Sequence, residues 1–213
     1  MSESRAEPPK ADPRRHMPAT LRNREAILAV LRDGVLPKSG MLLEIASGSG
    51  EHAAFMAPQL TPLLWQPSDF DAENLPSIDA HAGDSGAANI RPAVRIDVTQ
   101  QPWPVPDNIA ALLCCNMIHI APWAAAEGLF AGAAAIMPVP GAPLVLYGPF
   151  RRNSEHTAPS NAAFDDSLKA RDPRWGVRCL DTEVVPLAAQ NGFVLDRIVE
   201  MPANNLTVIF RKT

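Results

Sequence analysis

A chain of 213 residues is long enough to bury the core of one domain and short for two. Its formal net charge of −4, with no run of basic residues longer than a pair, argues against a surface that binds nucleic-acid phosphates. Two of its three cysteines, Cys114 and Cys115, are adjacent, which suits neither a disulfide framework nor a zinc site, so we expect no metal and a cytoplasmic protein with reduced thiols.

The N-terminal residues lack the apolar segment of a signal peptide, and no apolar window reaches the roughly 18 residues of a membrane span. We therefore expect no contact with a membrane. Residues 1–15 are polar and rich in proline, which predicts a flexible tail before a single domain over residues 16–213.

Hydrophobic periodicity predicts helices and strands in alternation over the first two thirds of the chain. We expect a helix over 21–31 that ends near Gly34, a strand over 41–46 and a helix over 51–57. A strand over 63–68, interrupted by Pro67 and ending at Asp69, and a polar helical segment reaching residue 88 follow. Strands over 93–98 and 109–116, a helix over 123–137 and a strand over 144–147 follow. The continuously apolar stretch 109–116 is typical of a central parallel strand.

The pattern changes after Tyr147. Residues 148–178 are long, polar and interrupted, with one short helix near 162–170, and we interpret them as a lid-like substrate loop. A helix over 182–190 then precedes strands over 193–200 and 206–211, whose short connection predicts an antiparallel hairpin. The element order predicts an α/β protein with a Rossmann-like, seven-stranded, mostly parallel sheet, helices on both faces and a C-terminal antiparallel hairpin.

Residues 42–52 read LLEIASGSGEH, a buried strand that opens into a glycine-rich turn. Such turns hold phosphates, dinucleotides or S-adenosylmethionine. A P-loop is excluded because a glutamate and a histidine, and no lysine, follow Gly50. A dinucleotide site stays open, since Gly48, Gly50 and Ala53 fit the G-x-G-x-x-G/A pattern and Asp69 lies about 20 residues on, where a ribose ligand is expected.

Carboxylates on three successive strands favour S-adenosylmethionine over a dinucleotide. Glu44, inside the first strand, is poorly placed beside a pyrophosphate and well placed to attract an ammonium group. Asp69, at the end of the second strand, can accept hydrogen bonds from ribose hydroxyls. Asp97, at the end of the third, can accept from an adenine amino group, with the backbone N–H of Val98 directed at the ring.

The segments LLEIASGSGEHAAFMA, LLWQPSD, NAAFDDSLKARDPRWGVR and EMPANNL resemble the uncharacterised methyltransferase-like family called domain of unknown function 938, within the class I S-adenosylmethionine-dependent methyltransferase superfamily. The resemblance covers roughly residues 16–213. It implies the class I methyltransferase fold and S-adenosyl-L-methionine as cofactor, and it implies little about the acceptor. Arg22 and Asn23, on the first helix, also resemble a family feature and could close over the cofactor.

Together, the motifs and the resemblance predict a cofactor site along one edge of the sheet. His52 could reach the cofactor or could serve as a packing or capping residue, and Glu51 is expected mainly to favour the start of its helix. The predicted cofactor-binding residues are Asn23, Glu44, Ser47, Gly48, Gly50, His52, Asp69, Phe70, Asp97, Val98, Asn116 and Met117.

His119 and Tyr147 are the predicted catalytic residues. Methyl transfer from a sulfonium needs alignment, and it needs a base only when the acceptor must lose a proton. His119 could be that base or, equally, a histidine hydrogen-bonded at the edge of a buried strand, and Tyr147 is expected to form a wall of the acceptor pocket. Arg22, Asn116 and residues 150–175 complete this pocket, in which Arg151 and Arg152 hint at an anionic acceptor.

The sequence thus predicts an S-adenosylmethionine-dependent methyltransferase that acts on a small-molecule acceptor. Two alternatives stay open: a non-catalytic protein that binds S-adenosylmethionine or another partner, and an NAD-dependent oxidoreductase. The oligomeric state is not indicated by the sequence.

Overall fold

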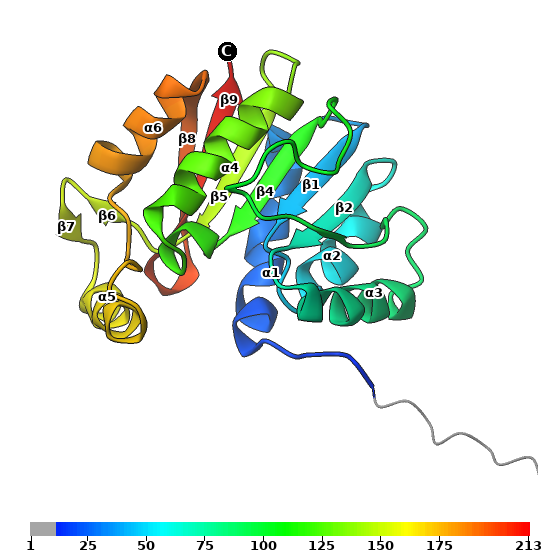
Figure 1. The fold of residues 1–213 in the computed structure, drawn as a ribbon, viewed down its shortest axis with the longest axis horizontal. Helices are drawn as coiled ribbons and strands as arrows, with labels where there is room; N and C mark the ends of the chain where they lie inside the picture. The colour runs from blue at the N-terminus through cyan, green and yellow to red at the C-terminus, as the bar shows by residue number, and fades with distance from the viewer. Residues whose placement is uncertain (1–11) are drawn as a thin grey trace, which may run out of the picture.

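The computed structural model describes residues 12–213 (Figure 1). Most of the predicted flexible tail, residues 1–11, lies outside the described residues. Residues 12–17 follow an extended path and contact the body of the protein: the backbone N–H of Arg15 donates to the Ser77 hydroxyl at 2.9 Å, and the N–H of Met17 donates to the Glu51 carboxylate at 2.8 Å.

Seven strands form the main sheet in the order β3-β2-β1-β4-β5-β9-β8 (Figure 1). Their bounds are β1 Met41–Ile45, β2 Leu64–Asp69, β3 Val94–Arg95, β4 Ala111–Cys115, β5 Pro143–Gly148, β8 Phe193–Met201 and β9 Asn205–Lys212. Neighbouring strands from β3 to β5 are parallel, and β9 is antiparallel to both β5 and β8. The predicted Rossmann-like sheet with a C-terminal antiparallel hairpin is confirmed.

Within residues 12–213, six α-helices surround this sheet: α1 Pro18–Val30, α2 Glu51–Met56, α3 Leu75–Asp84, α4 Trp123–Ile136, α5 Pro159–Arg171 and α6 Val185–Gln190. Short 3-10 or π turns cover Leu31–Val35, Ala57–Leu60, Ala72–Asn74, Met117–His119, Leu180–Val184 and Pro202–Asn204. Gly34, predicted to end the first helix, has a positive φ of 69° within the first of these turns. No helix within residues 12–213 is both long enough and apolar enough to cross a membrane.

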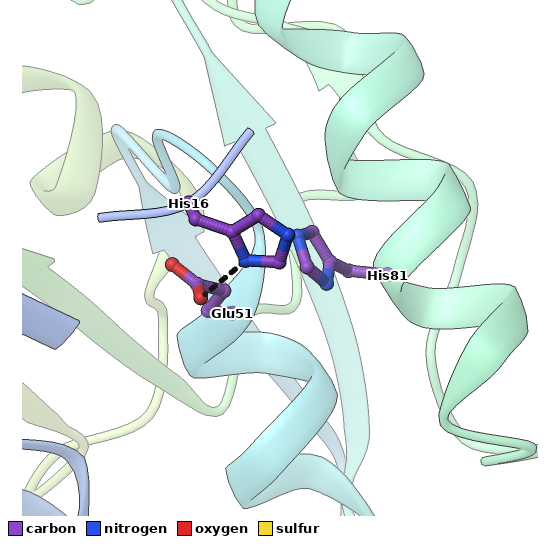
Figure 2. Close-up of side chains that lie close together, drawn as sticks. All are labelled: His16, Glu51 and His81. Carbon is purple, nitrogen blue, oxygen red and sulfur yellow. Dashed lines mark hydrogen bonds and ion pairs between the residues drawn. The ribbon is translucent and has the colours of Figure 1, made fainter. Parts of the chain in front are cut away.

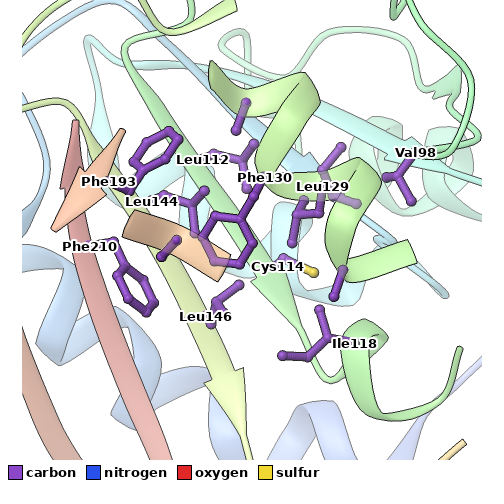
Figure 3. Close-up of a cluster of buried hydrophobic side chains, with 14 of the residues drawn as sticks. Val98, Leu112, Cys114, Ile118, Leu129, Phe130, Leu144, Leu146, Phe193 and Phe210 are labelled. Carbon is purple, nitrogen blue, oxygen red and sulfur yellow. The ribbon is translucent and has the colours of Figure 1, made fainter. Parts of the chain in front are cut away.

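Alternating side chains of the strands supply the two hydrophobic layers. Leu43, Leu112 and Leu144 point to one face and pack with α4 and with α6, as Figure 3 shows in part. Leu42 and Val145 point to the other face and pack against α1 and α2. Both faces of β1, β4 and β5 are therefore buried, which explains why these strands read as nearly continuous apolar runs.

The second strand, predicted over residues 63–68 and ending at Asp69, is observed as β2 Leu64–Asp69, and it continues through Pro67. The backbone N–H of Trp65, two residues earlier, donates to the Asn89 carbonyl, on the side away from β1. By the two-residue period of a strand, the N–H that Pro67 lacks would face that same side. Proline is tolerated there because β3 is short and pairs only with Ser68 and Asp69.

The strand predicted over 93–98 is reduced to the two residues of β3. Beyond it the chain turns at Asp97, whose Oδ1 accepts the Thr99 backbone N–H at 3.0 Å and the Thr99 hydroxyl at 2.7 Å. This side-chain turn competes with strand pairing and ends the element early.

The lid-like segment 148–178 contains a two-stranded ribbon and a helix. The ribbon joins β6 Arg151–Arg152 to β7 Glu155–His156, and α5 is longer than the predicted short helix because it starts at Pro159, a favourable first position. Asp165 of α5 accepts the Val177 backbone N–H at 2.7 Å, and Asn161 donates to the Asn204 carbonyl at 2.9 Å. The segment is thus anchored at several points, and its role as a substrate lid stays a prediction.

Gly128 of α4 sits against the backbone that follows β3, and a Cβ added there would collide with the Val98 carbonyl group. We expect Gly128→Ala to lower the free energy of unfolding by about 1–3 kcal/mol through overpacking, although alanine is the better helix former. Urea denaturation measures this. Gly83→Ala in α3 is the matched control, because a Cβ there meets nothing within 4 Å and should be neutral or stabilising by up to about 1 kcal/mol. Equal effects of both changes would contradict the packing role.

Candidate functional site

The carboxylate of Glu44 lies inside the protein at the end of β1, with 1% of the residue exposed. Its Oε2 accepts hydrogen bonds from the Ser47 hydroxyl at 2.8 Å and from the Trp65 indole N–H at 2.9 Å. Its Oε1 is buried and has no hydrogen-bond partner among the described residues. Burial raises the pKa of Glu44 from its ordinary value of 4.5 to about 7, against the two hydrogen bonds, which lower it. A positive charge nearby would favour the ionised carboxylate.

The turn after β1 depends on left-handed backbone conformations. Ala46, Gly48 and Gly50 have φ values of 59°, 60° and 92°. A Cβ on Gly50 would lie 2.5 Å from the Cα of Ile78, so α3 packs closely on this glycine, whereas a Cβ on Gly48 would meet nothing within 4 Å. Gly50 is required for packing, and Gly48 leaves open space in which a ligand can approach the backbone.

Asp69, at the end of β2, joins this turn to the next one. Its Oδ2 accepts the Gly48 backbone N–H at 2.8 Å, and its Oδ1 accepts from the Asp71 backbone N–H at 3.0 Å and from the Asn74 side chain at 3.1 Å. The loops that follow β1 and β2 are therefore fixed relative to each other, and two predicted cofactor-binding residues, Gly48 and Asp69, lie side by side.

Asn23, His52 and Tyr147 gather on the same face of the sheet as Glu44. Nε2 of His52 lies 2.8 Å from Oδ1 of Asn23, and Nδ1 of His52 lies 4.0 Å from Oε1 of Glu44. Burial lowers the pKa of His52 to about 4, so the ring is neutral at pH 7. Because Nε2 donates to Asn23, the lone pair of the ring is on Nδ1, and two acceptors, Nδ1 and Oε1, face each other. This arrangement suits a cationic hydrogen-bond donor.

The phenol of Tyr147 belongs to this group because it contacts the Asn23 side chain. Burial raises the pKa of Tyr147, and the contact with Asn23 lowers it in part. Tyr147 is 4% exposed. Its backbone carbonyl accepts the N–H of Asn116, a residue with a positive φ of 62°. The ends of β4 and β5 are thereby held side by side.

His119 and Asn116 converge on Gly148 from the other face of the sheet. A Cβ on Gly148 would lie 2.8 Å from Nε2 of His119 and 3.1 Å from Oδ1 of Asn116, so only glycine fits without displacement of these side chains. His119 is fully buried, and its ring meets that of Phe150 edge-on at 4.8 Å between centroids. The two polar side chains, His119 and Asn116, therefore form one compact group at Gly148.

The protonation of His119 follows from its partners. Nδ1 accepts the Arg178 backbone N–H at 3.2 Å, and burial lowers the pKa of His119 to about 3. The neutral ring therefore carries its proton on Nε2, which has no hydrogen-bond partner among the described residues. In this state Nε2 is a donor. Arg178 also holds the loop after β4 by donating to the carbonyls of Ile118 at 2.9 Å and Ala121 at 2.8 Å.

Four of the predicted cofactor-binding residues lie apart from these groups. The Asp97 side chain is used in its own turn with Thr99. Phe70 is 59% exposed beside Arg95, whose guanidinium lies 5.8 Å from the ring centroid. Val98 and Met117 are buried in the hydrophobic cluster beneath α4. Their contact with a cofactor stays a prediction.

Arg151 and Arg152 are not free to attract an anionic acceptor. Arg151 pairs with Glu183 at 3.1 Å, and Arg152 pairs with Asp181 at 3.1 Å. Both carboxylates lie in the turn Leu180–Val184, so these arginines attach β6 to the start of the last helical segment. The structure does not support the hint of an anionic acceptor that rested on them.

Sequence reasoning missed the residues that hold the site residues in place. The Trp65 indole donates to Glu44, and the Asn74 amide donates to Asp69. Arg178 donates to the loop that carries His119. Only Trp65 gave a usable signal: a carboxylate predicted inside a buried strand requires donors, and an indole N–H on the neighbouring strand is suitable. Asn74 and Arg178 lie in connections whose course the sequence does not define.

The chain belongs to the family described as "Protein of unknown function (DUF938)", which it matches over residues 14–212. The predicted family membership is confirmed.

Several solved structures share the fold. The pyocyanin biosynthetic protein PhzM has a TM-score of 0.70 and 19% identity, over 92% of this chain and 56% of that one. The mitomycin 7-O-methyltransferase MmcR has a TM-score of 0.75 and 16% identity, over 92% and 54%. Human N-acetylserotonin methyltransferase, in complex with S-adenosylmethionine, has a TM-score of 0.73 and 14% identity, over 91% and 52%. The fold is thus that of S-adenosylmethionine-dependent O-methyltransferases, and this chain spans about half of their length.

Glu44→Gln tests the burial of the carboxylate. The folded protein holds a proton on Glu44 up to about pH 7, whereas the unfolded chain releases it near 4.5. The contribution of Glu44 to the free energy of unfolding is therefore complete below pH 4.5 and falls as the pH rises through 7. Relative to the Glu44→Gln variant, we expect wild type to lose up to about 3 kcal/mol of stability between pH 5 and pH 8.

Urea denaturation of both proteins at the two pH values measures this difference. His119 lies on the other face of the sheet, so its opposite contribution cancels in the comparison. A stability difference that does not change with pH would show that the Glu44 carboxylate is ordinarily solvated.

Proposed function

We propose that this protein is a methyltransferase that uses S-adenosyl-L-methionine and acts on a small-molecule acceptor. The observation that carries the proposal is the Glu44 carboxylate, buried beneath a glycine turn with its Oε1 unpartnered among the described residues. A buried carboxylate of this kind is costly unless a positive charge compensates it. The methionine end of the cofactor has an ammonium group and a sulfonium, and it has no phosphate that this carboxylate would repel.

The residues present fit this cofactor. Glu44 and His52 present acceptors to the ammonium group, and Gly48 leaves space above the backbone of the turn. Asp69 keeps acceptor capacity for ribose hydroxyls, because a carboxylate offers about four lone pairs and three donors reach it here. Asn23, Ser47, Gly50 and Asn116 hold the surrounding backbone and side chains. The cofactor, when bound, supplies the electrophilic methyl group.

The same contacts disfavour the dinucleotide alternative. A pyrophosphate at a glycine turn requires free backbone N–H donors. Here the N–H of Gly48 already donates to the Asp69 carboxylate at 2.8 Å, and Glu44 lies buried at the end of the strand that leads into this turn. Two carboxylates and few free donors make this turn a poor site for a phosphate group.

His119 and Tyr147 are proposed to act on the acceptor. With its proton on Nε2 and its Nδ1 engaged by Arg178, His119 is suited to donate a hydrogen bond and to position a polar acceptor atom, and it is unsuited to accept a proton at Nε2. Tyr147 flanks the Glu44 group through Asn23, at the end of β5. Both side chains border the edge of the sheet where β4 and β5 end.

The small-molecule acceptor is supported by the structural neighbours and by charge. The neighbours include an enzyme named for mitomycin and one named for N-acetylserotonin, both small molecules. A net charge of −4, with no basic run longer than a pair, gives no sign of a nucleic-acid acceptor. An in-line displacement on a sulfonium needs alignment and exclusion of water, which a closed pocket around a small acceptor provides.

Calorimetry with S-adenosylhomocysteine and, separately, with NAD tests the cofactor. We expect the purified protein to bind S-adenosylhomocysteine and to give no heat with NAD. Asp69→Asn should weaken the binding of S-adenosylhomocysteine by about 1–3 kcal/mol, because the charged acceptor of the ribose hydroxyls is lost. Asp71→Asn is the control, since that exposed carboxylate caps the next turn through the Glu73 N–H and should leave affinity unchanged. Heat with NAD alone would reverse the cofactor assignment.

Transfer of a labelled methyl group into a metabolite extract separates an enzyme from a non-catalytic binder. His119→Asn keeps an acceptor for the Arg178 N–H and removes the Nε2–H donor, so we expect methyl transfer to fall at least about tenfold while S-adenosylhomocysteine affinity stays the same. The unchanged affinity serves as the control for folding. Full transfer by this variant would remove His119 from the acceptor site.

A further inference from the structure

Three side chains that are far apart in the sequence meet at the edge of the glycine turn. His16 precedes α1, Glu51 begins α2, and His81 lies near the end of α3. One ring nitrogen of each histidine and one carboxylate oxygen of Glu51 lie within 4.8 Å of one another, and Figure 2 shows the three side chains directed at a common point. His16 Nδ1 is 3.2 Å from Glu51 Oε1.

The two oxygens of Glu51 have different surroundings. Oε2 accepts the Met17 backbone N–H and the Ser49 hydroxyl, both at 2.8 Å. Oε1 has only the ring of His16 among the described residues. The carboxylate is therefore oriented by backbone and hydroxyl donors, and its second oxygen is left to face the two histidines. Metal-binding carboxylates are commonly held in this way.

His81 is oriented by the backbone of the N-terminal segment. Its Nε2 lies 2.9 Å from the Arg15 carbonyl oxygen, to which it donates. In the neutral ring this leaves the lone pair on Nδ1, and a backbone carbonyl is a usual partner for the second nitrogen of a metal-binding histidine. The side chain of His16 is 71% exposed and meets His81 edge-on, so its ring is free to adjust.

We propose that His16, Glu51 and His81 bind one divalent transition-metal ion, with zinc as the preferred ion. Two imidazoles and one carboxylate are a frequent ligand set for zinc, with a water molecule or an anion in the fourth position. Ligand atoms of a tetrahedral zinc ion lie about 3.3 Å apart, given Zn–N and Zn–O bonds of about 2.0–2.1 Å. The contact of His16 with Glu51 already has this length, and the two separations that involve His81 are at most 4.8 Å.

The fourth position has room. A groove of about 360 Å³ borders the three ligands and is otherwise lined by Leu21, Arg24, Ala54 and Phe55. Arg24 stacks on Phe55, with its guanidinium carbon 4.3 Å from the ring centroid, so it lies in the groove without pairing with Glu51. A water molecule or a small anion bound to the ion would face this arginine, whose positive charge complements it.

The ion would fasten residues 12–17 to the start of α2 and to the last turn of α3. This segment already contacts α3 and the residue before it through Arg15. The Arg15 backbone N–H donates to the Ser77 hydroxyl, and its guanidinium donates to Oδ1 of Asn74. Asn74 in turn contacts Asp69, and Glu51 directly follows Gly50. Metal binding would therefore add stability at the border of the glycine turn. The proposal does not depend on methyl transfer.

Zinc uptake by the tag-free, full-length protein tests the site. After treatment with a chelator, the protein is titrated with Zn²⁺ in competition with a chromophoric zinc-binding dye. We expect one bound ion, at least about tenfold weaker binding in His16→Ala and in His81→Ala, and no measurable uptake in the double variant. Zn²⁺ should also raise the melting temperature of wild type and leave that of the double variant unchanged.

His156→Ala is the matched control, because it removes a histidine of β7 outside the cluster and should keep the ion. Urea denaturation of each variant, including the more conservative His16→Gln, shows whether lost zinc binding reflects an unfolded protein. Co²⁺ in place of Zn²⁺ should give the visible absorption of a four-coordinate site without a thiolate band. The proposal is overturned by absence of uptake in wild type, by full uptake in the double variant, or by a thiolate band, which would place the ion at a cysteine.

Discussion

Burial of the Glu44 carboxylate is the constraint on which the site depends. A carboxylate without water is costly, and its cost falls only if donors reach it from the neighbouring elements. The Trp65 indole does so from β2, and the Ser47 hydroxyl does so from the turn that follows β1. The register that pairs Leu42 with Trp65 is needed for the first of these bonds. A slip of β2 along β1 would therefore leave the carboxylate without its donor.

The polar side chains at the strand ends form two groups, one on each face of the sheet. On the face covered by α1 and α2, His52, Asn23 and Tyr147 form a polar group around the unpartnered oxygen of Glu44. On the face covered by α4, His119 and Asn116 meet at Gly148. Because β1, β4 and β5 are adjacent, both groups lie at the ends of the same three strands, where open α/β sheets bind ligands.

Two segments without regular secondary structure, residues 12–17 and the loop around Arg178, hold these two groups in place. Arg178, at the end of the segment 148–178, donates to the loop after β4 and fixes the tautomer of His119. At the opposite side, residues 12–17 reach Glu51 and α3. Two segments from distant parts of the chain thus border the site. Their backbone N–H groups also donate to buried carboxylates, Met17 to Glu51 and Val177 to Asp165.

The sequence by itself determined the alternation of strands and helices, the glycine turn and the acidic strand ends, because periodicity, glycine and charge are local properties of the chain. Only the tertiary structure decided which side of β2 tolerates Pro67 and that β3 stops after two residues, since both depend on which neighbour each strand edge faces. The partners of Glu44 and His119, and the meeting of His16 with Glu51 and His81, also required it. Such contacts join residues whose distance along the chain carries no information about their distance in space.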